Sequence, residues 1–214
     1  MTFDRDVVVR CIQRHYDLLV RAAYLDPSII QQPPPSGWTE QDIMADVLRV
    51  LGRSEAVIDL LRHLPYISAP RNLGRYEIYE ETTPINYLRD YSPLRDSTAD
   101  SCHGKTVDDF DMFPADADWP SSFISLTGGR EATWWIIDTE EGVVFPAGVY
   151  TVDSDAPDEQ PWRQLARRRD VQEYFDEVYD EIVALKQVPV PKGSRSWYHR
   201  VVPGEDKEGL VSDS

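Results

Sequence analysis

The hydrophobic residues of this chain change their spacing along its length, and that change most limits the folds open to it. Over residues 4–25 they recur at intervals of three and four, which is the spacing of one face of a helix. Between residues 123 and 145 they form short runs rich in aromatic and β-branched residues, which are typical of strands. Beyond Asp170 the helical spacing returns. A chain that passes from helix to strand and back to helix is typical of the α+β class.

Three helices are predicted before the strands and one after them. The first covers residues 4–25 and ends before Pro27, with a polar side that carries Arg10, Arg14, Asp17 and Arg21. Thr39 and Ser54 suit the N-cap positions of the second and third helices, because their hydroxyls can accept from unpaired amides. The last helix has the clearest apolar stripe, which consists of Val171, Tyr174, Phe175, Val178, Ile182 and Leu185.

The strands are predicted from four runs. Alternation over residues 75–82 indicates one strand, and residues 123–127, 133–139 and 143–145 indicate a meander of three. Gly128-Gly129 and Glu140-Glu141-Gly142 supply turns between them. We therefore expect helices packed on one mostly antiparallel sheet, with amino-terminal helices and a carboxyl-terminal amphipathic helix.

The charge of the chain is strongly negative and unevenly distributed. The 214 residues carry a formal charge of −16, and residues 71–160 hold 19 acids against 6 bases, which accounts for −13 of it. Such a field repels phosphate backbones and attracts basic proteins, so we expect no nucleic-acid partner. The same acids also suit a solvated surface that only keeps the protein soluble.

The length favours one domain rather than two. We expect a single α+β domain over residues 1–187, followed by an extended tail over residues 188–214. Residues 89–118 are rich in aspartate and lack an apolar period, so they are predicted to be a poorly ordered insertion that faces water.

Several features indicate a cytoplasmic protein. No apolar run approaches the ~20 residues needed to cross a bilayer, and the first residues lack a basic stretch followed by an apolar one, so we expect neither a membrane partner nor a leader. The two cysteines, Cys11 and Cys102, form no disulfide framework or metal-ligand spacing. Cys11 fits the apolar side of the first helix, and both thiols are expected to be reduced.

No metal site or cofactor is predicted. Asp108, Asp109 and Asp111 offer oxygen ligands, but the spacing lacks the glycine and the closing glutamate of a calcium loop. The four histidines are scattered, so no pair with zinc-ligand spacing exists. Gly128-Gly129 lies between two strands, whereas phosphate-binding loops precede a helix.

Three features of the second half of the chain are candidates for function. Trp134 and Trp135 are adjacent on a strand and must point to opposite faces, so one ring enters the core and the other is covered or exposed as an anchor for a partner. Asp138 ends the same strand, where it suits either a turn or a catalytic carboxylate. Arg167-Arg168-Arg169 is the one basic cluster, and its arginines are expected to form ion pairs within the chain.

The order of motifs over residues 54–187 resembles the SUKH superfamily, which includes fungal regulators of cell-wall synthesis and bacterial immunity proteins. The similar parts are a helix running from Ser54 into Leu64-Pro65, and an apolar strand that ends in Asp138-Thr139 and resumes after Glu141-Gly142. The aromatic helix from Tyr174 also resembles the closing helix of that family. The resemblance implies an α+β protein without intrinsic catalysis that works by binding another protein.

Two functional hypotheses follow. The leading one is a non-enzymatic module that presents an acidic face to a basic protein, with contacts from Trp134 or Trp135, from Glu140 and Glu141, and from Asp108, Asp109 and Asp111. The alternative is a small hydrolase or isomerase that uses Asp138 in an aromatic pocket. A pocket that contains Asp138 would favour the enzyme, and Asp138 bonded into a turn would favour the module.

Overall fold

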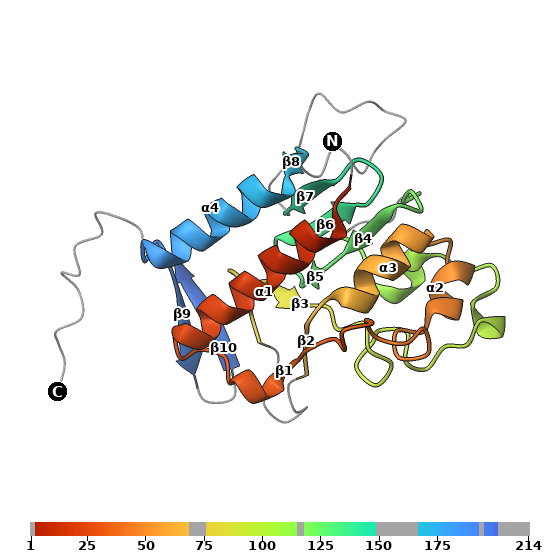
Figure 1. The fold of residues 1–214 in the computed structure, drawn as a ribbon, viewed down its shortest axis with the longest axis horizontal. Coiled ribbons are helices and arrows are strands. Elements are labelled where there is room, and N and C mark those ends of the chain that lie inside the picture. The colour runs from red at the N-terminus through yellow and green to blue at the C-terminus, as the bar shows by residue number, and fades with distance from the viewer. Residues whose placement is uncertain (1–2, 69–75, 115–117, 149–166, 193–194, 201–214) are drawn as a thin grey trace.

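The chain folds as an α+β protein in which helices cover one face of a four-stranded antiparallel sheet (Figure 1). The computed structural model describes residues 3–68, 76–114, 118–148, 167–192 and 195–200, with only the backbone for residues 191–200. None of the described helices combines the length and the apolar character that a bilayer-spanning segment requires.

The predicted helices are present, with shifted ends. They are α1 (Arg5–Arg21), α2 (Ala45–Val50), α3 (Glu55–His63) and α4 (Val171–Val183). The second is shorter than predicted because Thr39 and Asp42 bond to each other across a separate turn, and Met44 then takes a left-handed conformation with φ 55°. Every predicted member of the α4 stripe is buried except Leu185, which lies beyond the helix end and is exposed.

Ser54 caps α3 as its position predicts, since its Oγ accepts from the amide of Val57 at 3.3 Å. We expect Ser54→Ala to lower the free energy of unfolding by about 1 kcal/mol, because the amide then loses its acceptor. Urea denaturation followed by circular dichroism measures the change. Ser36→Ala, at an exposed position before α2, is the matched control and should leave the midpoint unchanged.

The four-stranded sheet confirms the predicted meander and extends it by one short strand. Its order is β4 (Phe123–Ser125), β6 (Trp134–Asp138), β7 (Val143–Ala147) and β8 (Arg169–Asp170), all antiparallel. Two of the three smaller antiparallel pairs are formed by residues 30–128. They are β1 (Ile30–Gln31) with β2 (Tyr66–Ile67), and β3 (Thr83–Pro84) with β5 (Thr127–Gly128).

Two predictions about strands are wrong. Within residues 76–82 the backbone turns back on itself, with φ 54° at Glu81 and a bridge between Tyr79 and Thr82, so no continuous strand forms there. The carboxyl-terminal region is not simply an extended tail, because β9 (Gln187–Lys192) and β10 (Arg195–Arg200) pair as an antiparallel hairpin. Residues 201–214 of the predicted tail lie outside the described residues.

Helices α1 and α4 lie side by side over the sheet and run in the same direction, red and blue in Figure 1. Cys11 contacts Gln172, and Arg14 pairs with Asp176 one turn further along both helices. Beneath them lies Trp135, whose ring meets Phe175 of α4 at 5.0 Å and His15 of α1 at 5.3 Å, both edge-on. Two helices from opposite ends of the sequence therefore cover strand β6 together.

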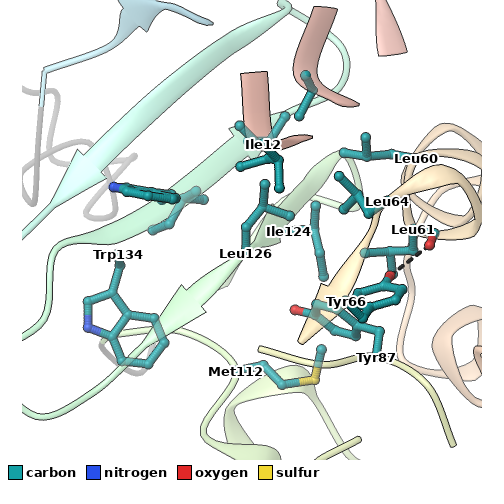
Figure 2. Packing of buried hydrophobic residues seen from close by; sticks show 14 of the residues in the cluster. Ile12, Leu60, Leu61, Leu64, Tyr66, Tyr87, Met112, Ile124, Leu126 and Trp134 are labelled. Carbon is teal, nitrogen blue, oxygen red and sulfur yellow. Dashed lines mark hydrogen bonds between the residues drawn. The ribbon is translucent and has the colours of Figure 1, made fainter. Parts of the chain in front are cut away.

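The acidic segment at residues 89–118 is more ordered than predicted. Its described residues bury apolar side chains in the main core, and these are Leu94, Cys102, Val107, Met112 and Phe113. Figure 2 shows Met112 in the same packed cluster as Tyr66 and Tyr87, where the dashed line marks the bond from the Tyr66 hydroxyl to the Leu61 carbonyl (2.7 Å). The prediction failed because short 3₁₀ turns bury single residues without any regular spacing.

Candidate functional site

Asp138 is bonded into the turn between β6 and β7. Its Oδ1 accepts from the amides of Glu140 (2.8 Å) and Glu141 (3.3 Å), and its carbonyl accepts from Gly142, which has φ 71°. The side chain is buried, and it does not line the cleft of about 780 Å³ that opens beside α1. Asp138 thus shapes the hairpin, as the turn interpretation predicts.

Trp134 and Trp135 do point to opposite faces of the sheet, but both are buried. Trp135 lies under α1 and α4, and Trp134 packs over Gly128 of β5, where an added Cβ would approach the indole to 3.3 Å. Neither ring is therefore an exposed anchor, and the expectation that one of them points outward is wrong. The local pattern could not show that β5 covers the second face.

The acidic residues themselves lie at the surface. Asp109, Asp111, Asp118 and Glu140 are exposed, and Asp108 is half-buried. The turn that carries Glu140 adjoins the end of the acidic segment, because the amide and the hydroxyl of Thr139 both donate to the carbonyl of Ser122 at 2.9 Å. We call these five residues, Asp108, Asp109, Asp111, Asp118 and Glu140, the acidic face.

An aromatic stack anchors the segment that carries Asp111 and Asp118. Phe113 stacks on Trp119 with 4.4 Å between ring centroids, Trp119 meets Phe123 of β4 at 6.1 Å, and Phe123 stacks on Phe145 of β7 at 5.4 Å. Asp109 also takes part in a capping box with Thr106, whose amide donates to its Oδ2 at 2.8 Å. The segment that carries the carboxylates is thus packed against the core rather than being a solvated loop.

Arg53 is a second support, which the sequence analysis missed. It follows α2 and is buried, and its guanidinium donates to the carbonyls of Pro120 (2.8 Å), Phe123 (2.9 Å) and Trp119 (3.0 Å). Burial lowers the pKa of Arg53 to about 10, while Asp108 and Asp118 act in the opposite direction, so the group stays charged at neutral pH. A single arginine between Gly52 and Ser54 gives no sequence signal that it turns inward.

The remaining charged candidates form contacts within the chain. Arg168 pairs with Glu141 at 2.8 Å, and Arg169 pairs with Glu177 at 2.5 Å, which confirms the predicted role of the two arginines. Glu141 therefore already forms an ion pair within the chain, whereas the side chain of Glu140 is exposed. Of the two predicted contact residues in this turn, Glu140 is the one that points to solvent without a described partner.

The described part of the chain contains no group of three or more His, Cys, Asp or Glu side chains that would hold a metal ion. Both cysteines are buried, and burial raises the pKa of the Cys11 thiol to about 11. His15 is also buried, with its Nε2 at 2.6 Å from the carbonyl of Ile78. Its position four residues after Cys11 and four before Leu19 placed it on the apolar side of α1, a signal that the sequence analysis did not use.

Comparisons of the chain with models of protein families, with curated proteins and with solved structures found no match.

Proposed function

We propose that this chain is a protein-binding module of SUKH type whose acidic face recruits a basic protein partner, and that it performs no chemistry of its own. The observation that carries the proposal is the construction of the acidic face. Exposed carboxylates lie in a segment that is anchored by the Phe113–Trp119–Phe123 ring contacts and by the bonds from the buried Arg53 to the carbonyls of Trp119, Pro120 and Phe123. Preorganised charge of one sign favours rapid association with a partner of the opposite sign.

The resemblance to SUKH proteins agrees with this proposal in the order of the elements. Helix α3 runs into Leu64-Pro65, strands follow, the hairpin of β6 and β7 turns at Asp138, and α4 comes after them, with the β9–β10 hairpin behind it in the chain. The enzyme alternative has less support, because the Asp138 carboxylate is occupied by two turn amides and is not directed into the cleft beside α1. A catalytic base must instead be within reach of substrate.

A charge-neutralising triple variant of the acidic face tests the proposal. Asp111→Asn, Asp118→Asn and Glu140→Gln leave the Thr106 capping box and the Asp138 turn intact, and asparagine tolerates the left-handed conformation of residue 111 (φ 51°). We expect the basic proteins that the native chain captures from its source cells to associate about tenfold more slowly with the variant at low salt. Affinity capture identifies them, and stopped-flow or surface-based kinetics on each purified protein measures the rate.

The control is Asp46→Asn, Glu173→Gln and Asp180→Asn, which changes the net charge equally at exposed positions on α2 and α4. It should retain the captured proteins and their association rates. Capture that is equal for both triple variants, or that yields acidic partners insensitive to salt, would contradict the proposal.

A further inference from the structure

The cleft beside α1 has the opposite charge from the rest of the molecule. Its volume is about 780 Å³, and it is bounded by α1, by Gln172 and Tyr179 of α4, and by Pro33 and Pro65 next to the β1–β2 pair. This volume is within the usual range for ligand sites. Three arginines and one aspartate line it, in a chain that has 38 acids and 22 bases. The cleft therefore brings basic side chains together in a chain that has few of them.

The arginines form one row on α1. Arg10, Arg14 and Arg21, together with Asp17, follow offsets of 0, 4, 7 and 11, so they share a face of the helix. Arg14 is held by Asp176 and lies over the Tyr179 ring at 4.7 Å. Among the described residues, Arg21 donates only to the Tyr179 hydroxyl (3.0 Å), and Arg10 has no hydrogen bond or ion pair. Two exposed guanidinium groups in the cleft thus have no carboxylate partner among the residues that the structure describes.

The distance between Arg10 and Arg21 indicates how long a ligand must be to contact both side chains. A helix rises about 1.5 Å per residue, so Arg10 and Arg21 are separated by about 16 Å along α1. An extended peptide covers that distance in about five residues. Gln13, Gln32 and Gln172 also line the cleft, and side-chain amides suit a peptide backbone. The amides of Gln13 and Gln172 each donate one hydrogen bond within the chain, to Asp17 and to Asp176. A single inorganic anion would contact only one end of the row.

We infer that this cleft binds an extended acidic segment of another protein, with one carboxylate paired to Arg10 and another to Arg21. Arginine forms two parallel hydrogen bonds with a carboxylate, which gives such pairs both strength and orientation. The site is separate from the acidic face and takes ligands of the opposite charge, so it does not depend on the proposed function.

Fluorescence anisotropy tests the inference with a fluorescein-labelled peptide that carries two glutamates about five residues apart. The same peptide with two glutamines is the reference ligand. We expect the full chain to bind the glutamate peptide at least tenfold more tightly at low salt. Arg10→Gln combined with Arg21→Gln should abolish that preference.

Arg49→Gln combined with Arg95→Gln is the matched control, because both arginines are exposed, lie outside the cleft and already pair with acids. This control should bind the glutamate peptide as the native chain does. Three results would overturn the inference: unchanged binding by the Arg10/Arg21 variant, displacement of the peptide by an equal concentration of inorganic phosphate, or self-association of the chain that the same double substitution removes. Self-association of that kind would mean that the cleft binds a second copy of this chain.

Discussion

Replacement of Arg53 by methionine is expected to lower the free energy of unfolding by about 4 kcal/mol. Methionine fills a similar volume but donates no hydrogen bond, so the carbonyls of Trp119, Pro120 and Phe123 lose the guanidinium that they share. Buried acceptors without a donor cost the full free energy of their lost hydration. Urea denaturation at pH 7, followed by tryptophan fluorescence, measures the effect.

Arg49→Met is the matched control, because Arg49 forms an exposed ion pair with Glu40 and Glu55 and should contribute less than about 1 kcal/mol. Should Arg53→Met fail to fold, Arg53→Lys provides the milder change, since an ammonium lacks the planar fork that reaches all three carbonyls. Hydrogen exchange should then rise in residues 107–114 and 118–123 in particular. Equal destabilisation by the changes at Arg49 and Arg53 would show that Arg53 is not the anchor of this segment.

The stability of the protein is expected to fall by about 2 kcal/mol between pH 7 and pH 5 because of His15. Burial on the inner side of α1 lowers the pKa of His15 to about 4, from 6.5 for an exposed histidine. The unfolded chain consequently binds a proton in this window that the folded chain excludes. The stabilisation is complete above pH 6.5 and is lost as the pH falls towards 4. Thermal unfolding at closely spaced pH values measures the slope.

His15→Gln separates this effect from the titration of other groups. Glutamine keeps a donor for the carbonyl of Ile78 and has no charge to gain, so its stability should be nearly constant from pH 7 to pH 5. His103→Gln is the control, since His103 is exposed, and it should keep the native slope. A native slope in the His15 variant would mean that other groups cause the acid sensitivity.

The parts of the fold that the sequence predicted correctly are those with a regular period and local capping. Helix α4 and the meander of β4, β6 and β7 have long apolar runs, and Asp138 occupies a turn position with a recognisable pattern. These features depend on neighbours within a few residues, so one sequence suffices to predict them.

The parts that failed depend on contacts between distant segments. Trp134 is buried where Gly128 of β5 lies against it, and the acidic segment is anchored by isolated residues such as Met112 and Phe113 that reach the core. The candidate site was predicted in part: the acids of residues 108–111 are at the surface, but the scaffold beneath them, including Arg53, had no local signal.

The pairing of α1 with α4 also has a consequence for synthesis on the ribosome. Arg14 and Asp176 are 162 positions apart, so the first helix emerges long before the helix that completes its packing. Until then the nascent chain exposes the apolar surface of α1 and the ring of Trp135, which Phe175 later covers. Cotranslational folding of this protein should therefore finish late, and ribosome-bound chains that stop before Val171 should need chaperone protection.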